Sequence, residues 1–295
     1  MATWIPESAS PRLAGAGRSF GWTGFTSAIA REPVALLGLV LVLLYVLVAL
    51  TVTFLPLRDP LQISTNRLAA PSLEFPLGTD ALGRDLLSRV LFGARLSIQV
   101  SAFSVALATL VGGLLGLISG YLGGATDLVI GRVLDVFFAF PAILLALGIV
   151  AALGPDPNNV ILAIGVVYTP IFARVVRGPV LALKARDFVE AARAIGATRA
   201  RIVARHIVPN LLSTLIVQVS LALSWSVLTE GALSFLGLSA QPPAPSWGVM
   251  LNEGRQYLEF ATHLALFPGM AIMVAVLGFN LLGDGLRDAL DPQRR

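Results

Sequence analysis

The chain has 295 residues, of which 56% are hydrophobic and only 13% are charged. A soluble domain carries roughly 25% charged residues, so this composition excludes an ordinary soluble enzyme and a disordered protein alike. There is no cysteine, which excludes disulfides and thiolate chemistry, and the two histidines, His206 and His263, do not have the spacing of zinc ligands. Long apolar runs instead indicate an integral membrane protein.

Six apolar runs are long enough to cross the ~30 Å hydrocarbon layer as helices, which takes about 20 residues each. None of them alternates apolar and polar residues as the strands of a membrane barrel do. The sequence therefore predicts an all-α integral membrane protein with six transmembrane helices. The predicted spans are residues 34–55, 97–120, 136–153, 160–175, 211–229 and 264–282.

The distribution of basic residues predicts the orientation of these spans. With the N-terminus in the cytoplasm, the inner segments (1–33, 121–135, 174–210 and 283–295) together hold 15 Lys and Arg residues, whereas the outer segments hold 6. Because cytoplasmic loops retain positive charge, both termini are expected in the cytoplasm. The net charge of +4 reflects this bias rather than nucleic-acid binding.

The most informative segment is the basic loop between the fourth and fifth spans. Asp187 followed by Glu190 resembles a capping box, so a helix is expected to start there. Gly196 is expected to end that helix in a left-handed conformation. A second helix is expected over residues 199–206, stopping before Pro209. The apolar side chains of the first helix recur on one face, and they are Phe188, Ala191, Ala192 and Ile195.

A short helix that projects into water with a narrow apolar face needs something to cover that face. The face could pack on the cytoplasmic ends of the chain's own helices, or it could fill a groove on a soluble partner. The small side chains of Ala191 and Ala192 favour the partner, because they let two backbones approach closely.

Five residues inside the spans are candidates for helix packing or for a hinge. Gly112, Gly116 and Gly120 recur every fourth residue, a pattern that lets a second helix approach closely, within this subunit or across an interface. Pro141 and Pro170 lie inside predicted spans, where each removes a backbone hydrogen bond and kinks its helix. Such breaks are candidates for a pathway or a hinge.

Charged residues near the expected outer surface form a further set. Glu230 lies at the outer end of the fifth span, where a carboxylate at membrane depth is costly, which makes it a candidate for the translocation pathway. The alternatives are exposure at the membrane interface or pairing with an arginine such as Arg95. Between residues 80 and 95 apolar residues recur at helical spacing among charged ones, which predicts an amphipathic helix on the outer surface. That helix could brace the mouth of a pore or contact a binding protein.

The loop motif resembles that of a known family. Glu190-Ala191-Ala192, then three residues, Gly196 and Pro209 resemble the EAA loop of ABC importer permeases, and His206 is typical of the peptide and nickel branch. Three more blocks resemble the same branch, and they are residues 78–97 (GTDxxGRDxxSRxxxGxRxS), 233–248 (LSFLGL, then PPxPSWG) and 280–292 (NLLGDGLRD, then DP). Over residues 33–295 the chain is similar to the second permease subunit of dipeptide, oligopeptide and nickel importers.

This resemblance implies a type I ABC importer permease fold in the bacterial inner membrane. It implies a cytoplasmic N-terminal segment running into the first span at 1–33, and the first transmembrane helix with a periplasmic segment at 34–96. The permease core is expected at 97–295, with a cytoplasmic coupling loop at 176–210 and a cytoplasmic tail at 283–295. The residues expected to dock an ATPase are Asp187, Phe188, Glu190, Ala191, Ala192, Ile195 and Gly196.

The function implied is a non-catalytic, pore-forming subunit of an ATP-driven importer of di- or oligopeptides, with nickel or another small solute as the alternative cargo. The implied partners are a second related permease, two ATP-binding subunits, an extracytoplasmic substrate-binding protein and membrane lipid. ATP and Mg²⁺ are expected on the partner ATPases, because the only lysine, Lys184, does not follow a glycine as a phosphate-binding loop requires. No metal site and no nucleic-acid contact are expected.

A self-contained secondary transporter or channel is the rival interpretation. It needs ionisable residues inside the spans for coupling, and the predicted spans are nearly free of them.

Overall fold

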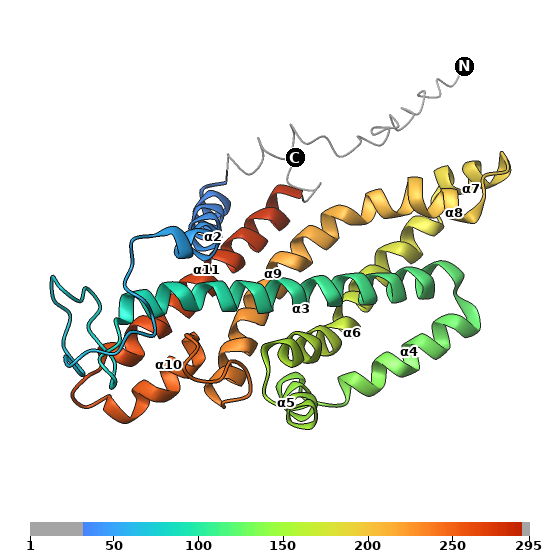
Figure 1. Ribbon diagram of the computed structural model, residues 1–295. Coiled ribbons are helices and arrows are strands. Elements are labelled where there is room, and N and C mark those ends of the chain that lie inside the picture. Colours follow the sequence, from blue (N-terminus) through green and yellow to red (C-terminus); the bar gives the residue numbers. More distant parts are fainter. Residues whose placement is uncertain (1–31, 291–295) are drawn as a thin grey trace, which may run out of the picture.

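The computed structural model describes residues 32–290, and every regular element in that range is a helix (Figure 1). Expectations for residues 1–31 and 291–295, at the two ends of the chain, lie outside the described residues. Five helices are long and apolar enough to cross a membrane, and they are α2 (Pro33–Thr51, extended by the 3₁₀ turn η1, Val52–Phe54), α3 (Leu86–Leu122), α6 (Pro157–Lys184), α9 (Val208–Phe235) and α11 (His263–Leu290).

A bent pair of helices supplies a further span. α4 (Gly124–Phe138) and α5 (Ala142–Leu153) pass the same test together, and they meet at an angle of 88°. The all-α membrane class is therefore confirmed, with five spans or six when the bent pair is counted as one. The start expected for the span over 136–153 is wrong, because the helical pair begins at Gly124, whereas the kink expected at Pro141 is found as the break between α4 and α5. Proline disfavours a helical conformation at the preceding residue, here Phe140.

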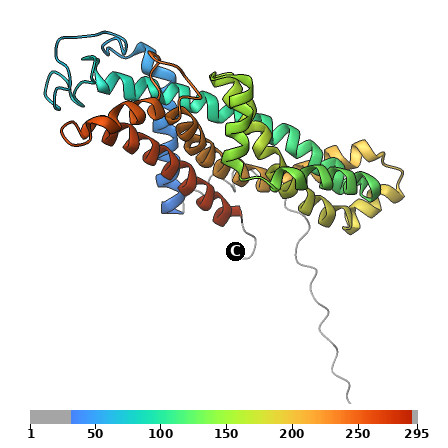
Figure 2. The same ribbon diagram turned by 90° about the horizontal axis from the view of Figure 1, so that it is seen from below.

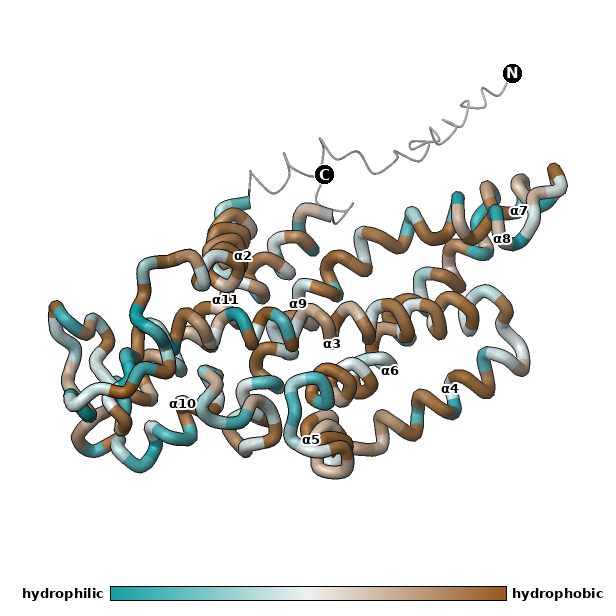
Figure 3. The backbone as a smooth tube through the Cα atoms, in the orientation of Figure 1, coloured by the Kyte–Doolittle hydropathy of each residue, from teal (hydrophilic) through white to brown (hydrophobic). Residues whose placement is uncertain are grey.

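The helices pack around α6. It lies along α3, against α5 and against α9, while α11 lies between α2 and α9 (Figures 1 and 2). In its most apolar stretch 61% of α6 is buried, against 22% for α2, so α6 is the central helix and α2 lies at the periphery. Apolar residues cover the outside of the long helices as well as their contacts (Figure 3), as expected for surfaces that face lipid or another membrane subunit.

Short elements mark the two ends of the elongated molecule. One end carries α7 (Asp187–Ala194), α8 (Arg199–Ile202) and the π-helical turn η2 (Val203–Ile207), beside the last turns of α3 and α6 (Figure 1). The other end carries the irregular segment 56–85, α10 (Trp247–Gly254) and η3 (Arg255–Tyr257). These are called the α7 end and the α10 end below.

Two of the expected boundaries are wrong. The segment 121–135, expected as an inner loop, contains most of α4. The helix expected to stop before Pro209 continues through η2 directly into α9, with the proline in the first turn of α9. Proline lacks an amide hydrogen, and the wider π turn before it accommodates the missing backbone bond.

Candidate functional site

Helix α7 is the part of the predicted coupling loop that projects furthest from the bundle (Figure 1). It begins at Asp187, after Arg186 in an extended conformation, and no side chain caps it. The capping-box expectation is therefore wrong, because Asp187 already lies inside the first turn. Asp187 and Glu190 instead place two carboxylates near the positive end of the helix dipole, which stabilises the helix start.

The face of α7 that turns inward differs from the expected one. Val189 and Ala192 are 0% and 7% exposed, and they pack in a cluster with Val176 and Val180 of α6 and with Ile202 of α8. The expectation that Ala192 shares an outer face with its apolar neighbours is wrong. The missed residue is Val189, whose spacing of three from Ala192 was the available signal.

The remaining apolar residues of α7 face outward. Phe188 is 39% exposed and Ile195 is 86% exposed, and Ala191 lies exposed between them in the sequence. The Phe188 ring lies 6.1 Å from the ring of His206, which belongs to η2. The α7 helix is therefore attached to the bundle by one narrow face and presents a second apolar face to its surroundings.

Gly196 ends α7 as the sequence predicts. Its φ is +83°, in the left-handed region that favours glycine. The amide of Gly196 donates to the carbonyl of Arg193 at 3.1 Å, and the amide of Ala197 donates to the carbonyl of Ala192 at 3.0 Å. This pair of bonds is a Schellman motif, which satisfies two carbonyls at the helix end. Arg199 follows in α8, whose start is capped by the Thr198 hydroxyl.

The three glycines of α3 face α6 of the same chain. A Cβ atom at Gly112, Gly116 or Gly120 would come within 3.0 Å of atoms of Thr169, Ala173 or Val180, respectively. Two of these three closest atoms are backbone carbonyl oxygens, which cannot move without moving α6. The glycines therefore set the distance between α3 and the central helix.

The two proline candidates occupy different environments. Pro141 lies in the break between α4 and α5, where the chain bends, whereas Pro170 is buried within the continuous helix α6. A second proline inside α6, Pro179, was not singled out from the sequence. The bend at Pro141 is thus the larger departure from regular helix.

Glu230 is buried within α9 and is only 1% exposed. Its Oε1 accepts a hydrogen bond of 3.3 Å from the Ser239 hydroxyl, in the segment that follows α9. The hydroxyls of Ser97 on α3 and Tyr45 on α2 lie in the same polar cluster. Arg95, which the sequence suggested as a partner, is exposed instead. Glu230 therefore links α9 by a hydrogen bond to the segment that leads to α10.

The segment 80–95 does not form a surface helix, so that expectation is wrong. α3 begins at Leu86, with the Asp85 carboxylate accepting from the Ser88 amide at 2.9 Å as its cap. Asp80, Arg84 and Arg89 are all buried. Beside the local pair of Arg84 and Asp80, the charges of this segment are held by contacts from distant parts of the sequence, which no local pattern reveals.

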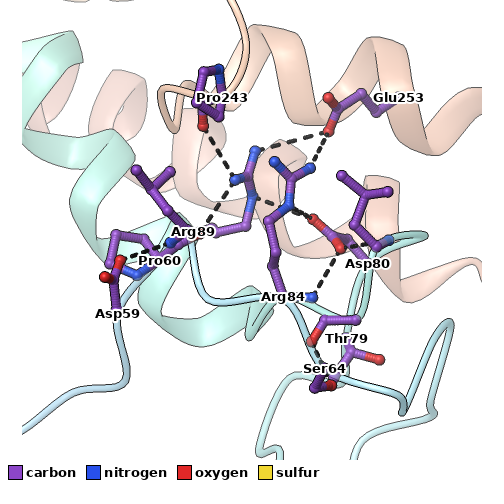
Figure 4. A network of polar contacts seen from close by, with 12 residues as sticks. Asp59, Pro60, Ser64, Thr79, Asp80, Arg84, Arg89, Pro243 and Glu253 are labelled. Atoms are coloured by element: carbon purple, nitrogen blue, oxygen red, sulfur yellow. Dashed lines mark hydrogen bonds and ion pairs between the residues drawn. The ribbon is translucent and has the colours of Figure 1, made fainter.

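Those contacts form a network at the α10 end (Figure 4). The Arg84 Nε lies 2.5 Å from Asp80 Oδ2, and its Nη2 lies 3.4 Å from Glu253 Oε2. Arg89, which is 0% exposed, lies 3.5 Å and 3.7 Å from the same two carboxylates, and it donates to the carbonyls of Pro60 and Pro243 at 3.3 Å and 3.4 Å. Two guanidinium groups thus share two carboxylates and join segment 56–85, α3 and α10.

No cluster of three or more His, Asp or Glu side chains in residues 32–290 is placed to hold a metal ion. The described residues form a bundle of long apolar helices with a buried charge network at the α10 end and the exposed apolar face of α7 at the other end.

Comparison with known proteins agrees with this arrangement. Residues 112–295 match the family described as binding-protein-dependent transport system inner membrane component. The chain is 44% identical over 275 residues to the dipeptide transport system permease protein DppC of Alkalihalophilus pseudofirmus, across 93% of this chain and 90% of that protein. It is 45% identical over 274 residues to the glutathione transport system permease protein GsiD of Pectobacterium atrosepticum, across 92% and 91%.

Two solved structures share the fold. One is the MetNI methionine ABC transporter in inward-facing conformations, with a TM-score of 0.56 and 19% identity, covering 69% of this chain and 97% of that chain. The other is an amino acid ABC transporter with histidines, with a TM-score of 0.54 and 16% identity, covering 67% and 92%. The chain belongs to the binding-protein-dependent transport family, and it is a membrane-spanning permease subunit of an ABC importer.

Proposed function

We propose that this permease imports di- or oligopeptides, including glutathione-like peptides, and that α7 is the element through which it is driven. The substrate class is supported by two relatives, one of which transports dipeptides and the other glutathione, both of them peptides. The match to each covers more than nine tenths of this chain. Nickel or another small solute is the alternative cargo.

The docking role of α7 is supported by its two faces. Val189 and Ala192 attach the helix to α6 and α8, so the helix cannot move without moving the bundle. Phe188, Ala191 and Ile195 remain exposed at the end of the molecule. An exposed apolar face on a short, anchored helix suits a groove on a partner. This exposed face is the single observation that carries the proposed docking role of α7.

The partners we propose are two ATP-binding subunits, a second related permease and an extracytoplasmic substrate-binding protein. The family description names dependence on a binding protein. The excess of Lys and Arg in the segments around α7 supports a cytoplasmic position for the α7 end, where the ATPases are, and both termini share that side. The α10 end then lies on the outer side and meets the binding protein.

Transport then follows from linked movement. ATP and Mg²⁺ bind to the partner subunits, and closure of those subunits draws the α7 helices together. Reversing an equilibrium between inward-facing and outward-facing states from 1:99 to 99:1 takes about 5.5 kcal/mol. In this proposal the chain itself supplies no such energy, so α7 must transmit it without bending. The Schellman motif at Gly196 and the contacts of Val189 give the helix that stiffness.

The test is association with the ATPase subunits. Replacing the exposed Ala191 by Trp is expected to abolish co-purification of the ATPases, because the larger side chain overfills the docking groove. The same change at Ala70, an exposed alanine at the α10 end, is the matched control and is expected to leave co-purification intact. Undiminished co-purification of the Ala191→Trp variant contradicts the docking role of α7.

The substrate class is tested separately. Proteoliposomes that contain the complete transporter and its binding protein are expected to take up labelled dipeptides only when ATP is supplied to the ATPases. Uptake driven by an ion gradient through the permease alone indicates the rival secondary transporter. Uptake of nickel but not of peptides rejects the proposed cargo while leaving the coupling role of α7 intact.

A further inference from the structure

A cavity of about 590 Å³ lies at the α7 end, between the last turns of α3 and α6 and the helices α7 and α8. Three cationic side chains line it, and they are Lys184, Arg193 and Arg199. None of its lining residues is acidic. The cavity is separate from the exposed apolar face of α7, because Phe188, Ala191 and Ile195 do not line it.

These three cations are without ion pairs in the described part of the chain. The salt bridges formed by residues 32–290 involve other arginines, and the Lys184 ammonium lies 5.8 Å from the centroid of the Tyr121 ring. Three like charges around one cavity repel each other. An anion in the cavity removes that repulsion.

A neighbouring cavity shows the alternative arrangement. It has a volume of about 310 Å³ and lies between α4 and α6. There the Arg177 guanidinium donates to both carboxylate oxygens of Asp127, at 2.6 Å and 2.7 Å, and Arg174 lies 3.2 Å from Asp135. Two of the three arginines that line the smaller cavity, Arg174 and Arg177, are therefore paired with carboxylates of the same chain, whereas none of the three cations of the larger cavity is.

The position of the larger cavity indicates which anion it takes. Leu122 and Lys184 are the last residues of α3 and α6, so the cavity lies at the ends of two helices that are long and apolar enough to cross a membrane. Leu122 is 51% exposed and offers an apolar wall beside the cations. Cations next to an exposed apolar wall at the end of membrane-spanning helices suit a phospholipid, whose phosphate contacts the cations while its acyl chain contacts the apolar wall.

We propose that the cavity bounded by Lys184, Arg193 and Arg199 binds the phosphate headgroup of an anionic phospholipid of the inner leaflet. This lipid-binding proposal rests on one part of the proposed function, the position of the α7 end at the cytoplasmic membrane surface. A bound headgroup bridges α6, α7 and α8, and so holds the coupling helix to the membrane-spanning bundle through its charged side as Val189 holds it through its apolar side.

The test measures retention of labelled phosphatidylglycerol by the full-length permease, purified without ATPase subunits so that a failure of the docking proposal does not affect the result. Each cation near an anionic lipid contributes about 1 kcal/mol, which corresponds to about a fivefold change in affinity. Arg199→Gln is therefore expected to weaken binding about fivefold, and the change of all three cations to Gln about a hundredfold. Arg199→Lys is expected to restore most of the affinity.

Arg201 provides the matched control. It lies two residues from Arg199 on α8 and is exposed as Arg199 is, but it does not line the cavity. Arg201→Gln is expected to change lipid binding less than twofold. An equal loss in the two variants overturns the proposal, because it shows attraction to general surface charge. Unchanged thermal unfolding of each variant shows that a loss of binding is not a loss of folding.

Two competition measurements identify whether the bound anion is a lipid headgroup or a soluble phosphate. Phosphatidylcholine vesicles are expected to compete poorly with phosphatidylglycerol, and inorganic phosphate is expected to displace the lipid only weakly. Inorganic phosphate that competes as well as the lipid overturns the lipid assignment in favour of a soluble anion. Loss of the bound lipid when ATPase subunits are added overturns it in favour of carboxylates on the partner.

Discussion

The two ends of this permease differ in whether their charged and apolar side chains are covered or paired within the chain. At the α10 end, Arg84 and Arg89 are buried and matched by Asp80 and Glu253 within the chain (Figure 4). At the α7 end, Ile195 is 86% exposed, and a cationic cavity has no carboxylate of its own. The comparison teaches that the charges of the α10 end are paired within this chain, whereas the apolar face and the cations of the α7 end have no such partner in the described residues.

The largest effect on stability is expected from disrupting the buried charge network at the α10 end. Arg89→Ala leaves Asp80 and Glu253 without one of their two cations, and removing one partner of a buried charge network costs about 3 to 5 kcal/mol. Thermal unfolding of the purified permease in detergent measures this loss. Arg58→Ala is the control, because Arg58 and Glu74 are both exposed and such pairs contribute less than about 1 kcal/mol. Equal losses in the two variants contradict the buried role of Arg89.

The next effect concerns the helix that connects the two ends. Gly116→Ala places a methyl group against the backbone carbonyl of Ala173 and is expected to destabilise the protein by about 1 to 3 kcal/mol, because α3 and α6 must separate. Gly113→Ala is the matched control on the same helix, where nothing lies within 4 Å of the added carbon. It is expected to stabilise α3 by about 0.5 to 1 kcal/mol. Similar unfolding temperatures for the two variants argue against close packing at Gly116.

A smaller effect on stability but a large one on transport is expected at the end of α7. Gly196→Val forces a β-branched residue into the left-handed region, which costs about 1 to 2 kcal/mol, and it loosens the Schellman motif. Membrane insertion is expected to remain normal, while ATP-driven uptake falls relative to ATP hydrolysis. Normal uptake per ATP in this variant counts against a stiff coupling helix.

The smallest effect on stability is expected from the exposed face of α7. Ile195→Ser is expected to change the free energy of unfolding by no more than about 0.5 kcal/mol, because the side chain touches little of its own chain. Affinity for the ATPase subunits is expected to fall tenfold or more in a binding titration. Val189→Ala is the contrasting variant on the inner face, where stability falls by about 1 to 3 kcal/mol. A stability loss for Ile195→Ser as large as for Val189→Ala removes the distinction between the two faces.

Local patterns in the sequence were sufficient to predict several structural elements. Runs of apolar residues identified the long spans, because a helix that crosses a bilayer must be apolar over its whole length. Gly196 predicted the end of α7, because few other residues adopt a positive φ without strain. In each case the physical cause acts within a few neighbouring residues.

The candidate site was predicted less completely. Ala192 was assigned to the outer face of α7 because helical spacing identifies an apolar face but not the direction in which it turns, and Val189 competes for the same contact with α6. Pairing of Glu230 with Arg95 was one of the alternatives that the sequence left open, whereas its observed contact is the hydroxyl of Ser239. Both outcomes depend on how separate helices pack.

The sequence by itself therefore determined that this protein is a helical membrane permease of the ABC importer class, where most of its long apolar helices lie and where α7 ends. Only the tertiary structure decided the 88° bend between α4 and α5, the face that α7 turns to the bundle and the burial of Arg84 against Glu253. The physical reason is the distance along the sequence over which each interaction acts. Apolar length and backbone conformation are local properties, whereas Arg84 and Glu253 lie 169 residues apart in the sequence and meet only after the helices have packed.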